Sequence, residues 1–152
     1  MQMNDPLAKY NTDDLRIKEI KELSPPGHVL REFPMSPAAA ETTYEARQAI
    51  HRILHGADDR LLVVVGPCSS HDVTAAQEYS VKLLAQKRAL EKDLLIVMRV
   101  YFEKPRTTVG WKGLIMDPHL DGTHDIPTGL RLARTFLRDV LDLGLPTATE
   151  LL

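Results

Sequence analysis

The chain has a single cysteine, Cys68, among its 152 residues. One thiol cannot form an internal disulfide, which excludes a disulfide-stapled scaffold and fits a reducing compartment. No apolar run approaches the ~20 residues that a membrane-spanning helix needs. The first residues also lack the basic and apolar regions of a signal peptide. We therefore expect a cytoplasmic protein that does not associate with membranes.

The chain also lacks an excess of positive charge. Nineteen Lys and Arg stand against twenty-one Asp and Glu, a formal net charge of −2. This balance gives no electrostatic basis for binding nucleic acid or an anionic membrane surface. With 43% hydrophobic and 26% charged residues, the composition is typical of a globular protein.

Residues 1–35 are polar and interrupted by prolines, and they predict an N-terminal arm that precedes the main domain. Within the arm, residues 15–23 are ambiguous. Leu15 and Ile17 alternate as in a strand, whereas Ile17, Ile20 and Leu23 recur every three residues as in a helix. These apolar residues are too few for a core, so we expect them to pack on another surface.

Residues 36–152 alternate between helical and strand patterns. Ser36 and Asp72 are the expected N-caps of two helices, and Gly56 and Gly144 are expected to end the first and third helices. The continuous apolar run 61–65 predicts a strand buried on both faces. The other elements are expected as a helix from 72 to about 90, a strand from about 94, a helix around 130–144 and a strand beginning at 145.

This alternation predicts an α/β fold with parallel strands joined by right-handed crossovers. Three strands cannot close a barrel, and three parallel strands make a poor isolated sheet. We therefore expect the chain to be the first part of a larger α/β protein, ending in its third strand.

Residues 99–113 concentrate positive charge just beyond the second strand. Four cations stand here against one anion, Glu103; the cations are Arg99, Lys104, Arg106 and Lys112. Runs of charge are most often solvated loops. Here, however, Pro105 stiffens the turn, and Thr107 and Thr108 can donate to phosphate oxygens. The segment favours a site for a small, multiply anionic ligand.

Cys68 follows the first strand in the segment 66–72, where α/β folds place their sites. The residue pattern leaves three interpretations: a small buried hydrophobe, a thiolate ligand of a metal ion, or a catalytic nucleophile. His71, three residues later, can be a ligand, a base or a polar residue at a helix start. Trp111 is expected to be a packing anchor, and His119 and His124 receive no role.

Together, Gly66-Pro-Cys-Ser69 and residues 99–113 (Arg-Val-Tyr-Phe-Glu-Lys-Pro-Arg-Thr-Thr-Val-Gly-Trp-Lys-Gly) resemble the type I DAHP synthases. Enzymes of this family are transferases that condense phosphoenolpyruvate with erythrose 4-phosphate, the first step of the shikimate pathway to chorismate and the aromatic amino acids. The resemblance runs from about residue 13 to the end of the chain. It includes residues 58–65, 71–72, 114–115, 117–119 and 145–150.

The resemblance implies an eight-stranded (β/α) barrel of the TIM type, of which this chain supplies the arm and the first strands. It implies that Cys68 is one ligand of a divalent metal ion (Mn, Fe, Co or Zn). By the same resemblance, Arg99 and Lys104 contact phosphoenolpyruvate, Lys104 being the catalytic candidate. Arg106 and Thr107 hold the erythrose 4-phosphate end.

The arm is most similar to that of the phenylalanine-inhibited isozymes. In those enzymes it joins the subunit interface and the inhibitor pocket. The resemblance therefore implies a homo-oligomer, feedback inhibition with phenylalanine as the first candidate, and Asp13, Asp14 and Ile17 as regulatory residues.

Two departures from the family pattern stand out. Ser70 occupies a position where isoleucine is common, with an expected modest effect on packing or affinity. In addition, the family's remaining metal ligands, a histidine and two carboxylates, come from later strands, so we expect this chain alone to be inactive. Two other functions remain open: a non-catalytic anion-binding or subunit-interaction domain, and a thiol hydrolase using Cys68 and His71.

Overall fold

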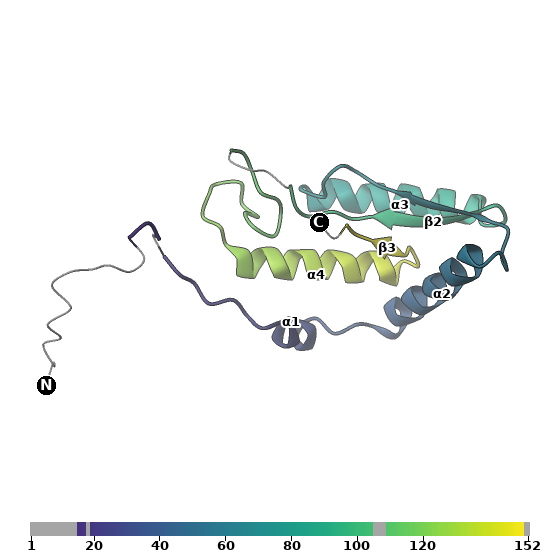
Figure 1. Cartoon of the computed structure of the whole chain (residues 1–152), viewed down its shortest axis with the longest axis horizontal. Coiled ribbons are helices and arrows are strands. Elements are labelled where there is room, and N and C mark those ends of the chain that lie inside the picture. The colour runs from purple at the N-terminus through teal and green to yellow at the C-terminus, as the bar shows by residue number, and fades with distance from the viewer. Residues whose placement is uncertain (1–14, 18, 105–108, 151–152) are drawn as a thin grey trace, which may run out of the picture.

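The computed structural model describes residues 15–17, 19–104 and 109–150 (Figure 1). In chain order, the elements are α1 (Pro26–Glu32), α2 (Pro37–Leu54), β1 (Leu61–Val65), α3 (Val73–Ala89), β2 (Leu94–Arg99), α4 (Ile126–Asp142) and β3 (Thr147–Ala148). From α2 onward they alternate as the sequence predicts. Within the described residues, no helix is both long enough and apolar enough to cross a membrane.

The three strands form one parallel sheet in the order β1-β2-β3. Val65 pairs with Met98 near the end of β1, and Arg99 pairs with Ala148 at the end of β2. The predicted parallel pairing is therefore confirmed. All three strands run in the same direction, so the segments that follow them emerge at one edge of the sheet.

Helices α2 and α3 begin directly after the N-cap residues that the sequence predicts. The Ser36 hydroxyl accepts a hydrogen bond from the Ala39 amide, and the Asp72 carboxylate accepts one from the Ala75 amide, each 3.0 Å long. Both side chains satisfy amides that the first turn of a helix leaves without a partner. Asp125 caps α4 in the same way through the Thr128 amide.

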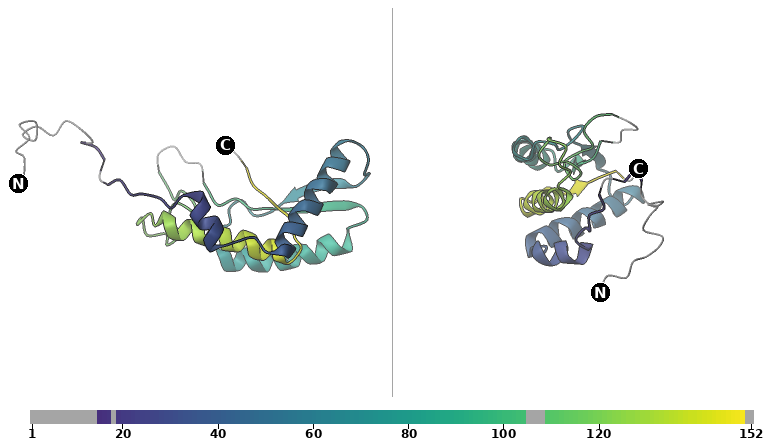
Figure 2. Two further views of the ribbon diagram at one scale, coloured as in Figure 1. Left: turned by 90° about the horizontal axis from the view of Figure 1, so that it is seen from below. Right: turned by 90° about the vertical axis from the view of Figure 1, so that its left-hand side faces the viewer.

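Helices α3 and α4 run side by side along the sheet (Figures 1 and 2). Their apolar faces meet β2 and the segment after it in one core, in which Phe136 packs edge-on against Phe102 with ring centroids 6.0 Å apart. The buried members of this core are Ala76, Leu84, Met98, Val100, Phe102, Leu114, Ala133, Phe136, Val140 and Leu145. The core therefore fixes the end of β2, from which the cationic segment leaves.

Strand β1 is not buried on both faces, so this expectation was wrong. Leu61 is 66% exposed and Val64 is 50% exposed. The reason is its place in the sheet, since β1 is an edge strand that pairs only with β2. The central strand β2 has the buried pattern that had been expected for β1.

The N-terminal region differs from expectation in one respect. A short helix, α1, follows Pro25 where the sequence had indicated only an interrupted arm. It is tied to α4, because Arg131 forms an ion pair with Glu32 at 2.8 Å and donates to Pro127 within its own helix. Residues 19–25 form neither a helix nor a strand, so neither reading of this segment was correct.

A glycine at the start of α4 allows its closest approach to the preceding loop. A methyl group added at Gly129 would lie 2.2 Å from the Ile115 carbonyl oxygen. We predict that Gly129→Ala lowers the free energy of unfolding by about 3 kcal/mol, because the backbone must move to relieve the overlap. Thermal or urea unfolding measures the change.

Gly27→Ala is the matched control for this substitution. Gly27 also lies in a helix, but the added methyl group would meet nothing closer than the Arg31 side chain at 3.7 Å. Its effect should be neutral or stabilising by up to about 1 kcal/mol, as alanine favours helix. Equal destabilisation by both substitutions would contradict the steric argument.

Candidate functional site

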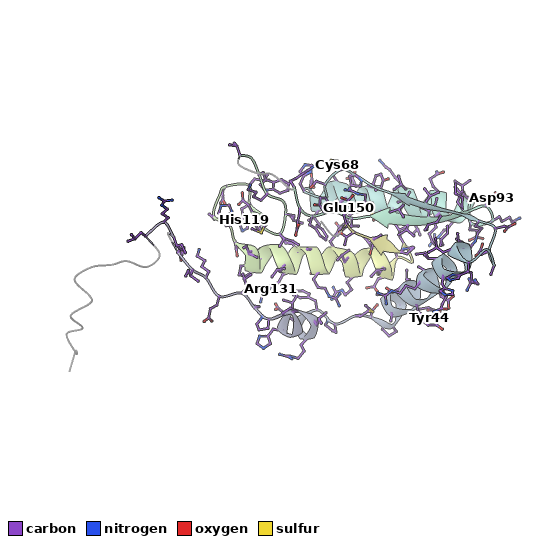
Figure 3. All side chains as sticks on the ribbon, viewed as in Figure 1. Tyr44, Cys68, Asp93, His119, Arg131 and Glu150 are labelled. Atoms are coloured by element: carbon purple, nitrogen blue, oxygen red, sulfur yellow. The ribbon has the colours of Figure 1, made fainter. Side chains whose placement is uncertain are left out.

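The candidate site lies at the edge of the sheet where the three strands end. Cys68 follows β1, Arg99 ends β2 with Lys104 shortly after it, and Glu150 follows β3. Figure 3 labels Cys68 and Glu150, which lie at the same end of the sheet although 82 positions separate them in the chain (150 − 68). Parallel pairing in register brings these polar groups together.

The β1–α3 loop packs closely on the end of β2. A methyl group added at Gly66 would lie 2.1 Å from the Arg99 carbonyl oxygen, so only glycine fits here. Two residues after Cys68, the amide of Ser70 donates to the Tyr101 carbonyl at 2.8 Å. These two contacts hold the Cys68 backbone against the segment that carries the cations.

Lys104 is the charged partner of Cys68. Its Nζ atom lies 2.8 Å from the Cys68 Sγ atom, although 36 positions separate the residues. The pKa of the exposed thiol is lowered, chiefly because the Lys104 ammonium donates a hydrogen bond to the sulfur. The charges of Lys104 and Arg99 add to this effect, while loss of hydration opposes it. The contact therefore favours a thiolate.

This exposed, charge-stabilised sulfur does not match the interpretation of Cys68 as a small buried hydrophobe. Nor does the structure favour a Cys–His hydrolase. His71 contacts the Trp111 ring edge-on at 6.0 Å, and its Nδ1 atom lies 3.4 Å from the Ser69 carbonyl oxygen. The interpretation as a metal ligand requires a thiolate, which the Lys104 contact stabilises.

Arg99 makes a second charged contact at this edge. Its Nε and Nη2 atoms lie 2.6 and 2.5 Å from the same Glu150 oxygen, Oε1. Its Nη1 atom donates to the Pro67 carbonyl at 2.7 Å, and its guanidinium lies 5.0 Å from the centre of the Tyr101 ring. Arg99 thus links the ends of all three strands.

Two buried hydroxyl groups flank this site. Ser69 and Ser70 are 8% and 2% exposed, and within the described residues neither Oγ atom has a hydrogen-bond partner. An unpaired hydroxyl in such a position costs about 1–3 kcal/mol. At Ser70, the residue expected to alter packing, the structure therefore shows complete burial without a compensating hydrogen bond.

The other residues predicted for the site have different outcomes. Asp13, Asp14, Arg106 and Thr107 lie outside the described residues. Ile17 is 52% exposed in the segment preceding α1. Trp111 packs against the core and donates from Nε1 to the Asp117 carbonyl at 2.8 Å, which confirms it as a packing residue.

Sequence reasoning missed Glu150 as a member of the site. The available signal was its place directly after the third parallel strand, whose end had to meet the same edge as Cys68 and Arg99. Within the described residues, no three His, Cys, Asp or Glu side chains come together as metal ligands. The described residues alone therefore do not assemble a three-ligand metal site around Cys68.

Comparison with known proteins identifies the family. The model of the DAHP synthetase I family matches residues 32–152. This chain belongs to the DAHP synthetase I family.

The relatives share most of this chain's length. The Phe-sensitive phospho-2-dehydro-3-deoxyheptonate aldolase of Escherichia coli K12 is 62% identical over 94% of the chain. A Trp-sensitive aldolase of Enterobacter agglomerans is 55% identical over 93% of it. The solved structure of the Francisella tularensis aldolase is 53% identical and covers 90% of the chain with a TM-score of 0.85.

The reverse coverage is much lower. This DAHP synthetase family member spans about 40% of the length of the curated relatives it matches, 41% of the first relative and 40% of the second. It likewise covers 40% of the solved structure. The family resemblance noted from the sequence is thus confirmed, and the chain is shorter than the relatives that it matches.

The Lys104–Cys68 contact generates a test by thiol reactivity. We predict that Lys104→Met raises the pKa of Cys68, because the thiolate loses both its hydrogen-bond donor and the adjacent positive charge. The pH midpoint of alkylation by iodoacetamide should shift upward accordingly. Lys92→Met, which removes an exposed lysine just before β2, is the control and should leave the midpoint unchanged. The same midpoint in both variants would contradict the assigned contact.

Proposed function

We propose that this chain contributes to a DAHP synthase, which condenses phosphoenolpyruvate with erythrose 4-phosphate to give DAHP and phosphate. The Lys104–Cys68 pair, next to Arg99 at the C-terminal edge of a parallel sheet, is the observation that carries the proposal. Family membership and the names of the relatives support it.

In this proposal the sheet is the start of a (β/α)8 barrel. Residues 36–152 provide its first part, and residues 1–35 form an arm with oligomeric and regulatory roles. The parallel order β1-β2-β3 supports the barrel, as does the exposure of β1, because further strands would cover its free edge. The enzyme would act in the cytoplasm as a homo-oligomer.

The cations are assigned to the anionic groups of the substrates. Arg99 and Lys104 bind phosphoenolpyruvate, and Arg106 and Thr107 bind the phosphate of erythrose 4-phosphate. A guanidinium presents paired N–H donors to a carboxylate or phosphate, while an ammonium acts as a point charge. Two phosphates and a carboxylate repel one another, so fixed cations are needed to hold the reacting carbons close together.

The reaction forms a bond from C3 of phosphoenolpyruvate to the aldehyde carbon. Water adds at C2, and the C2–O bond breaks as phosphate leaves. In this proposal Lys104, placed beside Cys68, donates a proton to the aldehyde oxygen as that oxygen gains charge.

A divalent metal ion fits the sulfur at this site. An exposed thiolate suits Mn, Fe, Co or Zn in order of increasing thiolate preference, and Cys68 is the ligand that this chain would contribute. Bound there, the ion would supply Lewis-acid polarisation of the aldehyde. The Lys104 ammonium donates a hydrogen bond to the same sulfur atom. Lys104 would therefore either share the Cys68 sulfur with the ion or turn toward the substrate.

The first test of this function is turnover by the protein purified from its own host, with its mass determined alongside. Phosphoenolpyruvate should be consumed only when erythrose 4-phosphate and a divalent metal ion are both present.

We predict that Cys68→Ala lowers kcat by on the order of 100-fold or more, since losing even an outer-shell partner of a metal costs 10–100-fold in activity. Lys92→Ala is the control and should leave turnover unchanged.

Turnover that survives both chelation and Cys68→Ala would contradict the role given to Cys68. The alternative function is a non-catalytic anion-binding or subunit-interaction domain. Binding of phosphoenolpyruvate without turnover by a folded 152-residue protein would support that alternative.

The proposal extends to feedback inhibition through the arm, with phenylalanine as the inhibitor. The names of the relatives describe Phe-sensitive and Trp-sensitive enzymes. We predict that Ile17→Asp weakens inhibition by phenylalanine about tenfold, because a charge replaces an apolar contact worth about 1–2 kcal/mol. Uninhibited turnover should not change.

Val81→Asp is the matched control, because Val81 on α3 has a similar exposure of 57% and lies outside the arm. It should leave inhibition by phenylalanine intact. If both variants or neither variant respond, the regulatory role of Ile17 is wrong. Stronger inhibition by tryptophan or tyrosine would correct the identity of the inhibitor.

A further inference from the structure

Tyr101 is a buried aromatic residue beside the candidate site. Its side chain is 5% exposed, and the centre of its ring lies 5.0 Å from the Arg99 guanidinium carbon. The backbone at this point is held from two sides. The Val100 amide donates to the Ala148 carbonyl in β3 at 2.8 Å. The Tyr101 carbonyl accepts from the Ser70 amide in the β1–α3 loop, also at 2.8 Å. The ring therefore has a fixed place next to the cation.

The contact with Tyr101 differs in kind from the other contacts of Arg99. Glu150 lies against the Nε and Nη2 atoms, and the Pro67 carbonyl accepts a hydrogen bond from Nη1. These two partners engage N–H groups that an anionic ligand would also use. The face of an aromatic ring attracts a cation through its π electrons and needs no donor. Of these three partners, Tyr101 is the one that leaves the N–H groups available.

The surroundings of the ring strengthen this attraction. The Arg99 side chain is 22% exposed and Tyr101 is buried, and a cation–π contact becomes stronger as the two groups lose water. Burial also raises the pKa of the Tyr101 phenol, so its hydroxyl is uncharged at neutral pH. Unlike Glu150, the ring therefore attracts the guanidinium without adding a negative charge that would repel an anion.

We propose that Tyr101 is a positioning residue for Arg99. Its ring holds the guanidinium in the orientation that an incoming anion meets, and it stays in contact when that anion displaces Glu150. An arginine that is fixed before binding loses less conformational entropy on binding, which raises the affinity. The inference rests on the proposed function for the nature of the anion, which is the carboxylate or phosphate of phosphoenolpyruvate.

The neighbouring residue, Phe102, provides a matched comparison. It is 7% exposed, and its ring packs edge-on against Phe136 in the apolar core. Tyr101 and Phe102 are thus adjacent buried aromatic residues whose rings have different partners. Shortening each side chain in turn separates the loss of packing from the loss of the contact with Arg99.

The test is a titration of the full 152-residue chain with inorganic phosphate and, separately, with phosphoenolpyruvate, followed by NMR of the Arg99 Nε–Hε group. Tyr101→Leu should weaken the binding of both anions roughly fivefold, because the guanidinium loses its cation–π partner. Tyr101→Phe keeps an aromatic ring and should bind within about twofold of the parent. Phe102→Leu, the control for lost packing, should also leave both affinities within about twofold.

A second measurement uses the unchanged chain. Nuclear Overhauser contacts between the Tyr101 ring and the Arg99 side chain should persist at saturating phosphate, and this result decides the proposal even should Tyr101→Leu fail to fold. Loss of these contacts in the phosphate complex would overturn the proposal. So would unchanged phosphate affinity in Tyr101→Leu, an equal loss in Tyr101→Phe or Phe102→Leu, or the absence of any response of Arg99 to either anion.

The two anions separate this inference from the proposed function. Binding of inorganic phosphate at Arg99 without binding of phosphoenolpyruvate would contradict the proposed function, while the phosphate affinities of the variants would still decide the role of Tyr101. Binding of phosphoenolpyruvate that is equally tight in the parent and in Tyr101→Leu would leave the proposed function intact and overturn the role of Tyr101.

Discussion

The parallel register of the three strands is the constraint on which the candidate site depends. Because Val65 pairs with Met98 and Arg99 pairs with Ala148, the segments after the strands leave the sheet at one edge. Polar groups far apart in the sequence therefore meet without forming a buried charged core. Their backbone is supported from below by the apolar contacts of β2 with α3 and α4, which rigidify the end of the central strand. Precise placement of charge at the edge thus follows from ordinary packing beneath it.

Much of the fold could be predicted because its signals are local. Ser36 and Asp72 each cap the helix expected from them, and the apolar runs at 61–65 and from 94 form strands. The burial of β1 could not be predicted in this way. An apolar run indicates that a strand can be buried, but its neighbours in the sheet decide whether it is, and β1 has a neighbour on one side only.

Helix α1 was missed because Pro25, Pro26 and Gly27 indicate a turn, yet proline at the first helical position also starts a helix.

The charged pairs of the site show where prediction from sequence stops. The order of elements placed Cys68 and the cations at one edge, but the pattern could not tell which cation meets the sulfur. Lys104 reaches Sγ because the segment after β2 folds back on itself: the Lys104 amide donates to the Lys112 carbonyl at 2.8 Å, and the Leu114 amide donates to Phe102 at 2.7 Å. Such a reversal depends on tertiary contacts, and no spacing in the sequence specifies it. The same holds for Glu150, whose partner Arg99 is set by the pairing of β2 with β3.

The Arg99–Glu150 pair has a consequence for ligand binding at this edge. Glu150 places a carboxylate against the guanidinium where, in the proposed function, the carboxylate or phosphate of phosphoenolpyruvate must bind. The two side chains are 22% and 43% exposed, so water screens the pair, and exposed pairs of this kind contribute only about 0–1 kcal/mol. A phosphate carries nearly two charges and offers several acceptor oxygens, so it competes well against a single carboxylate. The Pro67 carbonyl also accepts a hydrogen bond from Nη1 at 2.7 Å, a contact that would hold the guanidinium in place if substrate displaced Glu150. In the proposed function, Glu150 would therefore compete only weakly with substrate for Arg99, and the Pro67 contact would keep Arg99 oriented for an anion.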